Sequence, residues 1–288
     1  SDITVSFYNL LDYPPTLIDT AVSDADGAYQ IDIEPGFYLI EWTKDGYVPQ
    51  ELGSFPLAED TTLEDVTLVP GEVLTVDGNQ SGNWTTSYQY WVTDNIVVPV
   101  GQTLTIDEGV VVKFYEGTTF TANGTLEVNG TEDSRVLFTS KSPTPLPGDW
   151  GNVILNGENN MLSFLDYEYA DSGFTGENAN YTTFDNIIIN GTLSLTAYGI
   201  NLSNSSDLTV TNSFISTAGD YGIIADNSSN ATISGNTITG SYDQAAIRMN
   251  SCDTCTFSDN IISGQPYRGI WSSNSSNSLF TNNTIDAN

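Results

Sequence analysis

The sequence predicts an all-β chain: a small β-sandwich followed by a long solenoid of stacked β-coils. The main observation is a repeat in the last ninety residues, where Gly199, Gly222, Ala246 and Gly269 recur at intervals of 23, 24 and 23 residues. A second observation is that apolar residues alternate with Thr and Ser over short runs, as in Thr209–Thr211, without a helical period. A fixed period of this length indicates a solenoid in which each coil buries its apolar face against its neighbours.

Each coil of the repeat carries two apolar positions at fixed offsets from its small residue. Alternation of period two around these positions predicts short strands with one face inward. The first column is Val210, Ile233, Phe257 and Phe280, and the second is Ile215, Ile238, Ile262 and Ile285. With three short strands per coil, we expect a parallel β-helix that holds both columns in its interior.

Two polar columns accompany the apolar ones. They consist of Asn204, Asn227, Ser251 and Asn274, and of Ser213, Asn236, Asn260 and Asn283. Asn and Ser tolerate left-handed backbone angles, and amides stacked from coil to coil satisfy backbone groups at the bends. We expect both columns to be structural ladders rather than catalytic groups.

The upstream coils are less regular but continue the pattern. Trp84, the run Val98–Ile106, the run Val111–Phe114 and the Gly148–Gly151 turn resemble the opening coils of right-handed parallel β-helix proteins. The later coils resemble the pectate-lyase-like, NosD-type repeats of many secreted and surface proteins. The resemblance covers residues 84–288 and implies a right-handed solenoid, a scaffold that serves lyases, hydrolases, adhesins and structural parts alike.

Residues 1–70 lack the repeat and are strongly acidic. Val22–Ile33 alternates around an Asp-Gly turn, which predicts a β-hairpin, and a Pro-Gly turn follows it. These turns and the Lys44–Tyr47 end resemble the carboxypeptidase-regulatory-like (transthyretin-like) β-sandwich. That resemblance implies a module without activity of its own, beside other extracellular domains. We expect residues 71–83 to link it to the β-helix at 84–288.

Composition limits the possible partners. Of the 288 residues, 37 are Asp or Glu and 6 are Lys or Arg, which gives a formal net charge of −31, and histidine is absent. This acidity excludes nucleic acid, because little here can neutralise a phosphate backbone, and it disfavours anionic membranes. No apolar stretch is long enough to span a bilayer, so we expect no membrane insertion.

Three features favour an extracellular or cell-surface protein. The acidity suits a well-solvated extracellular chain, and an opening at Ser1 without Met indicates processing or trimming. Asn-x-Ser/Thr sequons are abundant and hint at a glycoprotein, although Asn-Ser-Ser turns produce sequons by composition alone.

Cys252 and Cys255 are the only cysteines. A zinc site needs further soft ligands, which this chain lacks, and a redox motif is expected beside a βαβ unit. We predict a local disulfide, as in an oxidising compartment, with a reduced and partly buried pair as the alternative.

Catalytic chemistry has weak support. A polysaccharide lyase needs a basic residue and a calcium cage of carboxylates, and Arg248 and Arg268 are the candidate bases. The best acidic set is Asp166, Glu168 and Asp171, which would be the calcium ligands if calcium is bound; no other cofactor is indicated. A glycosidase needs facing carboxylates, and the stacked positions on the next coil supply none. We therefore expect no catalysis, and we interpret these acids more simply as solvated charges.

Carbohydrate binding without chemistry is better supported. Tyr198 and Tyr221 share one position on successive coils, Arg248 and Trp271 share another, and Tyr267 lies in a neighbouring turn. Such a strip can pack on sugar faces, and the guanidinium can stack on the indole ring. The simpler alternative is that these rings only cover the ends of the hydrophobic interior.

The sequence as a whole favours a non-enzymatic structural or adhesive surface protein, with itself or surface glycans as partners. The repeat continues to Asn288, and the strand expected over Asp2–Tyr8 is a candidate for exchange between subunits, so a filament or surface layer is conceivable. The main alternative is a carbohydrate-binding or polysaccharide-cleaving β-helix. Ice binding by the Thr-rich faces is a weaker one, because exposed strands favour Thr in any case.

Overall fold

The structure is a computed structural model of the chain, and it describes residues 2–10, 15–190, 197–216, 219–240, 242–264 and 267–286. The chain divides into two compact units. One comprises residues 1–73 with the short segments 87–89 and 142–145, and the other comprises residues 74–86, 90–141 and 146–288. All regular elements of the described residues are strands, which confirms the all-β prediction. No described segment forms a helix that is long and apolar enough to cross a membrane.

The N-terminal unit contains a four-stranded antiparallel sheet in the order β2-β1-β3-β5 and a two-stranded sheet of β4 and β6. The strands are β1 (Thr4–Asn9), β2 (Thr16–Val22), β3 (Gly36–Thr43), β4 (Tyr47–Val48), β5 (Gln50–Leu57) and β6 (Val69–Pro70). Val5, Phe7, Ile40 and Trp42 form the centre of its core. Strand β1, considered above for exchange between subunits, pairs within this chain with both β2 and β3.

The predicted hairpin over Val22–Ile33 is only half formed. The turn is present, because the Asp24 N–H donates to the Ala28 carbonyl at 2.8 Å and Gly27 has a φ of 88°. Strand β2 ends at Val22, however, and residues 28–35 belong to no strand. The structure therefore gives one four-stranded sheet here, and the second sheet of a sandwich is not confirmed.

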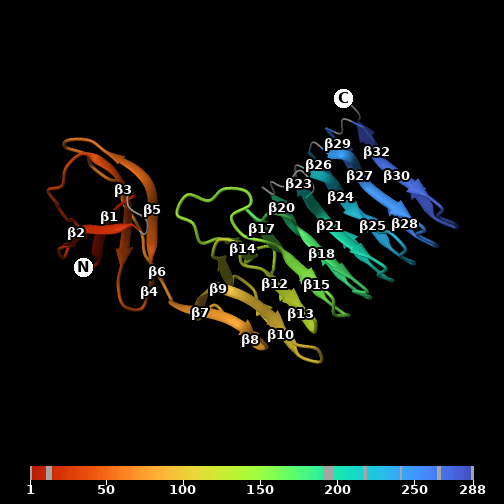
Figure 1. Cartoon of the computed structure of the whole chain (residues 1–288), viewed down its shortest axis with the longest axis horizontal. Coiled ribbons are helices and arrows are strands. Elements are labelled where there is room, and N and C mark those ends of the chain that lie inside the picture. The colour runs from red at the N-terminus through yellow and green to blue at the C-terminus, as the bar shows by residue number, and fades with distance from the viewer. Residues whose placement is uncertain are drawn as a thin grey trace. The chain divides into compact units, whose positions relative to one another are not determined.

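The second unit is a parallel β-helix made of three stacks of strands, visible side by side in Figure 1. Stack I contains nine strands: β8 (Gly82–Trp84), β10 (Thr103–Asp107), β13 (Thr125–Asn129), β16 (Met161–Ser163), β19 (Thr183–Asp185), β22 (Thr209–Thr211), β25 (Thr232–Ser234), β28 (Thr256–Ser258) and β31 (Leu279–Thr281).

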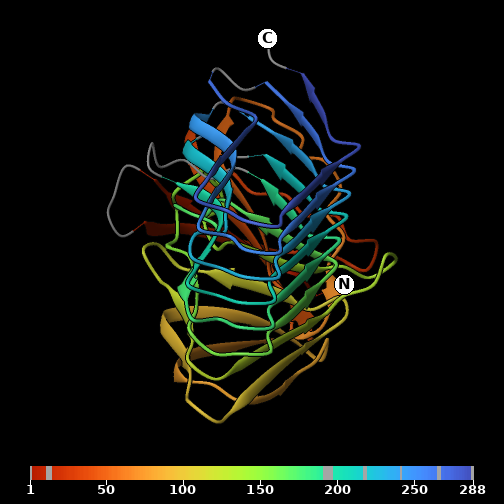
Figure 2. The same ribbon diagram turned by 90° about the vertical axis from the view of Figure 1, so that its right-hand side faces the viewer.

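Stack II and stack III both begin in the long strand β9 (Tyr88–Val98), whose two halves pair with different strands. Stack II continues with β11 (Val111–Phe114), β14 (Val136–Ser140), β17 (Leu165–Glu168), β20 (Ile188–Asn190), β23 (Phe214–Ser216), β26 (Thr237–Thr239), β29 (Ile261–Ser263) and β32 (Thr284–Asp286). Stack III continues with β12 (Phe120–Ala122), β15 (Val153–Leu155), β18 (Phe174–Glu177), β21 (Tyr198–Ser203), β24 (Gly219–Ile224), β27 (Tyr242–Asn250) and β30 (Ile270–Ser273). Figure 2 shows the coils stacked on one another.

The expected linker at 71–83 is not free of regular structure. It contains β7 (Glu72–Asn79) and most of β8, and β8 pairs in parallel with β10 through Gly82 and Trp84. Trp84 is 4% exposed and stacks on Tyr90 with ring centroids 4.3 Å apart. The first coil therefore starts before residue 84.

Both predicted apolar columns keep their register, and their first three members are buried, whereas Phe280 and Ile285 of the last coil are 43% and 47% exposed. Val210, Ile233, Phe257 and Phe280 are register partners in stack I, as are Ile215, Ile238, Ile262 and Ile285 in stack II. In the upstream coils, aromatic side chains from all three stacks also pack in the interior. Successive ring centroids lie 4.0, 4.9, 4.7 and 5.0 Å apart along the series Phe114, Trp150, Tyr167, Phe174 and Phe184.

The column of small residues has a steric cause. A Cβ added to Gly173 would lie 2.0 Å from the carbonyl oxygen of Gly199, and one added to Gly199 would lie 2.5 Å from that of Gly222. At Gly269 the obstacle would be the Ile285 side chain, also at 2.5 Å. Glycine is used here because neighbouring coils approach too closely for a side chain.

The polar columns are structural, as expected, but in two different ways. Asn204, Asn227, Ser251 and Asn274 all have φ between 50° and 56°, so this column marks a left-handed bend. The column of Asn236 and Asn260 is a buried hydrogen-bond ladder. The Asn260 side-chain oxygen accepts from the Asn236 N–H at 3.0 Å, and its amide donates to the Ile233 carbonyl at 2.9 Å.

We predict that Asn260→Ala lowers the free energy of unfolding by about 2–4 kcal/mol, because it leaves a buried N–H and a buried carbonyl without partners. Urea unfolding followed by circular dichroism would measure the loss. Thr256→Ala, on the outer face of the same coil, is the matched control and should change little. Equal effects of the two substitutions would contradict the ladder's role.

Candidate ligand-binding site

A cluster of rings and guanidinium groups lies on stack III, over strands β21, β24, β27 and β30. Tyr198 and Tyr221 are register partners, and their rings stack with centroids 6.2 Å apart at 14°. Tyr221, Ile224 and Ala245 form a buried cluster of their own, separate from the β-helix interior, with Tyr198 and Trp271 packed against it. The rings are therefore not simply covers for the interior, which was the simpler alternative.

Arg248 is the centre of this cluster. It is the register partner of Trp271, and its guanidinium carbon lies 5.6 Å from the Trp271 ring and 5.2 Å from the Tyr221 ring. Its Nη2 forms an ion pair with Asp226 Oδ2 at 2.6 Å. The Arg248 side chain is 33% exposed, so the group is held in place but still reaches the surface.

Asp226 is the residue that sequence reasoning missed. Its side chain is 13% exposed, and its other oxygen accepts the Asn250 N–H at 2.9 Å. Strand register could have indicated this residue. Ile224 is the register partner of Arg248, and Asp226 follows Ile224 by two residues, so its carboxylate lies within reach of the guanidinium. Aligning the coils by residue type alone gives no reason to pair this carboxylate with the arginine of the next coil.

The other two predicted residues differ in their surroundings. The guanidinium carbon of Arg268 lies 4.8 Å from the Trp271 ring, so Trp271 contacts two arginines. Tyr267 is 70% exposed and has no ring contact or hydrogen bond with a described residue. The structure thus brings Tyr198, Tyr221, Arg248 and Trp271 together and leaves Tyr267 at the margin.

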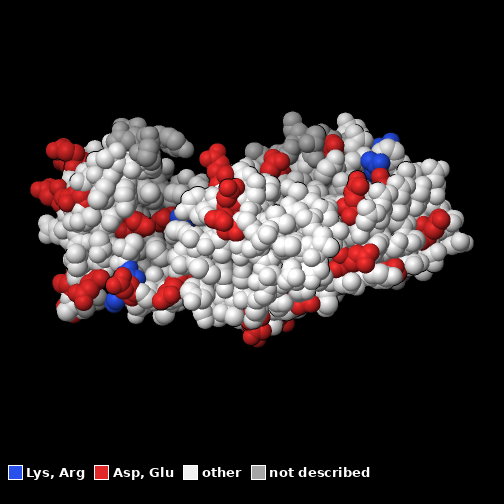
Figure 3. All heavy atoms as spheres, turned by 60° about the horizontal axis from the view of Figure 1, so that its bottom comes forward, with Lys and Arg blue, Asp and Glu red and all other residues white. Residues whose placement is uncertain are grey.

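The surroundings of the cluster are acidic. Figure 3 shows carboxylates scattered over the surface with few basic groups between them, as the net charge of −31 requires. Arg248 and Arg268 are two of only six basic residues in the chain. Two of the six basic residues therefore lie on the same indole ring.

Sequence comparisons agree with the topology. Residues 148–288 match the family model for a right handed beta helix region, and residues 78–182 match that for a pectate-lyase like beta helix domain. The second unit has the right-handed β-helix fold. No curated protein sequence matches the chain significantly.

Two solved structures are similar to this β-helix protein. The A-module of the mannuronan C-5 epimerase AlgE6 from Azotobacter vinelandii is similar over 76% of this chain and 75% of its own length, with 10% identity and a TM-score of 0.40. A mutant of the periplasmic alginate epimerase AlgG is similar over 66% of this chain and 61% of its own length, with 13% identity and a TM-score of 0.32. At these identities and TM-scores, neither similarity assigns an activity to this chain.

The predicted calcium ligands do not form a site in the β-helix. Asp166 is held in an ion pair by Arg135 at 2.7 Å, and Glu168 accepts a hydrogen bond from Thr139 at 3.3 Å. Within the described part of the chain, no group of three Asp, Glu, His or Cys side chains is arranged to hold a metal ion. The structure thus does not bring Asp166, Glu168 and Asp171 together, because each of the first two faces its own polar partner.

Arg135 instead has a structural role that its sequence position did not reveal. Its Nε donates to Asp166 at 2.7 Å, and its Nη2 donates to the carbonyl oxygens of Asn186 at 2.7 Å and Leu165 at 3.3 Å. These partners belong to the next two coils, so one side chain ties three coils together.

We predict that Arg135→Met lowers the free energy of unfolding by about 2–3 kcal/mol, since hydrogen bonds of a charged group are lost while the apolar stem is kept. Asp166→Asn should cost less, because the two carbonyl partners remain. Urea unfolding with and without calcium would measure both. If calcium stabilised the wild type but not Asp166→Asn, a metal role for Asp166 would be restored.

Cys252 and Cys255 form a disulfide across one bend of the β-helix. Both are buried, at 0% and 1% exposure, and belong to the interior cluster. The Cys252 N–H donates to the Ser275 hydroxyl at 3.1 Å, so Cys252 stands where neighbouring coils use serine in a hydrogen-bonded column.

We predict that replacing both cysteines by serine lowers the free energy of unfolding by about 2 kcal/mol at most, because the disulfide closes a very short loop. The serine at 252 should join the hydroxyl column of Ser228 and Ser275. Thermal unfolding of the double variant, compared with the reduced wild type, would test this. A loss well above this value would show that the disulfide does more than close the bend.

Proposed function

We propose that the β-helix binds an extended polysaccharide along stack III and does not cleave it. The observation that carries the proposal is Arg248, which lies between two aromatic rings and is fixed by the Asp226 carboxylate. Aromatic faces pack on the apolar faces of sugar rings, and a guanidinium offers several donors in a fixed plane to sugar oxygens. Because neighbouring protein groups already hold these side chains, little conformational entropy is lost on binding.

The strip is elongated rather than pocket-like. From Tyr198 to Trp271 it crosses four coils, and with about 4.8 Å between strands it extends about 14 Å along the axis. This geometry favours several consecutive sugar units over one small molecule.

The contacts of Arg248 and Asp226 support binding without cleavage. The Arg248 guanidinium is occupied by the Asp226 carboxylate, so it is poorly placed to remove a proton from a sugar. Asp226 is engaged by Arg248 and by the Asn250 N–H, so it is a poor general acid or base. The sequence alone favoured a structural or adhesive role, and glycan binding is itself one way in which a surface protein adheres. The disulfide supports export to an oxidising compartment.

We predict that Trp271→Ala and Arg248→Ala each weaken polysaccharide binding about tenfold or more, as expected for the central residues of a binding surface. Affinity electrophoresis through gels containing neutral or acidic polysaccharides would identify the ligand, and calorimetry would give the affinity. Arg248→Lys, which keeps the charge and loses the planar fork, should restore binding only in part.

Phe214→Ala is the matched control, since Phe214 is an aromatic residue of 38% exposure on stack II. If the gel retarded the wild type, Phe214→Ala and Trp271→Ala to the same extent, this surface would not be the polysaccharide-binding site. Release of products that absorb in the ultraviolet would show a lyase instead of a binding protein.

A further inference from the structure

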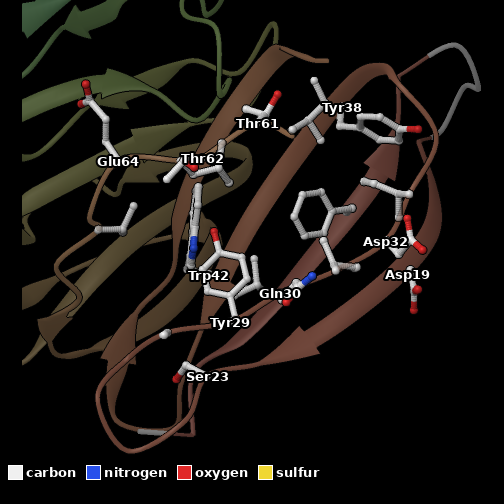
Figure 4. Close-up of a pocket in the computed structure, with 18 of the residues that line it drawn as sticks. Asp19, Ser23, Tyr29, Gln30, Asp32, Tyr38, Trp42, Thr61, Thr62 and Glu64 are labelled. Carbon is white, nitrogen blue, oxygen red and sulfur yellow. The ribbon is translucent and has the colours of Figure 1, made fainter. Parts of the chain in front are cut away.

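The N-terminal unit has a cavity of about 1620 Å³ that is open to solvent. The sheet contributes Val5, Phe7 and Trp42 to its wall, and segments 23–35 and 57–66 complete the lining. In Figure 4, Tyr29 lies beside Trp42. The volume exceeds that of usual small-molecule pockets, which is about 300–1,000 Å³, so the cavity suits a length of polypeptide better than a single metabolite.

Two of the lining segments are strand-like but unpaired. Tyr29, Ile31 and Ile33 are half-buried and pack on the core, while Gln30 and Asp32 between them are exposed. This alternation is that of a β-strand. Yet the backbones of residues 29–33 and 62–66 form no hydrogen bond with any residue that the structure describes. Rows of unpaired N–H and carbonyl groups are a template for an added strand.

The charge around the cavity is of one sign. The lining contains eight carboxylates and no Lys or Arg: Asp19, Asp26, Asp32, Glu34, Glu59, Asp60, Glu64 and Asp65. Asp32 and Glu64, both labelled in Figure 4, are exposed residues of the two unpaired segments. A concave wall lined by like charges concentrates the opposite charge.

We propose that this cavity takes up an extended, basic segment of another protein as an added β-strand. The added strand pairs with the backbones of residues 29–33 and 62–66. Its alternate apolar side chains face Phe7 and Trp42, and its Lys or Arg side chains lie opposite Asp32 and Glu64. Five paired residues extend about 17 Å, the usual length of a strand. A second copy of this chain is a poor occupant, because its net charge is −31 with only six basic residues.

The test uses the full chain and synthetic peptides of about ten residues. The probe alternates Val and Lys, and the comparison peptide has the same composition with all Lys before all Val. We expect the alternating peptide to slow amide hydrogen exchange about tenfold or more within residues 29–33 and 62–66, as measured by mass spectrometry. The block peptide and an alternating Val-Glu peptide should slow neither segment. Methylating alternate backbone nitrogens of the probe should abolish the protection of one segment, because it removes the hydrogen bonds of one edge.

A pair of charge variants tests the placement. Asp32→Asn/Glu64→Gln should weaken binding of the alternating peptide about tenfold, the sum of two exposed charge pairs. Glu132→Gln/Asp133→Asn makes the same change of charge in an exposed turn of the β-helix and should leave the affinity unchanged. The proposal fails if both variants weaken binding equally, or if both Lys peptides bind without protecting either segment. Either result would mean attraction to an acidic chain in general.

Discussion

Backbone hydrogen bonding from coil to coil, in fixed register, is the constraint on which the β-helix depends. Each strand of stacks I, II and III pairs in parallel with the strand one coil away, so every side chain lies above its counterpart. Apolar residues must then recur at the same position, and amides that recur at a bend can bond along the axis. Gly173 and Gly199 reflect the same constraint, since there the coils approach too closely for a side chain. Register explains both the columns of the interior and the polar ladders.

The same register builds the candidate site. Tyr198 lies beside Tyr221, and Arg248 beside Trp271, because strand pairing fixes their neighbours. A solenoid converts a position in a repeat into a line on its surface, and such a line is suited to ligands that are themselves repetitive. The ion pair of Arg248 with Asp226 adds what the repeat does not supply, a charged group whose orientation is set by a partner in the turn after strand β24.

Much of the β-helix could be predicted because periodicity is visible in a single sequence. The interior columns, the left-handed bends and the pairing of Arg248 with Trp271 all follow from a fixed offset. Contacts that cross the register could not be predicted in this way. Asp226 reaches Arg248 diagonally, and Arg135 reaches Asn186 two coils away, so neither pairing shares a position in the repeat. The ion pair of Asp166 could not be predicted for the same reason, since its arginine partner lies outside its own column. In the N-terminal unit, alternation identified a strand-like segment at Tyr29–Ile33, but alternation does not say whether a partner strand is present.

The reach of Arg135 has a mechanical consequence. In a solenoid each coil is coupled mainly to its two neighbours, so force applied along the axis peels coils away one after another. A side chain anchored to both Leu165 and Asn186 extends that coupling by one coil. The coils that also contain the aromatic series from Phe114 to Phe184 should then detach as a block, while the coils beyond the reach of Arg135 separate singly.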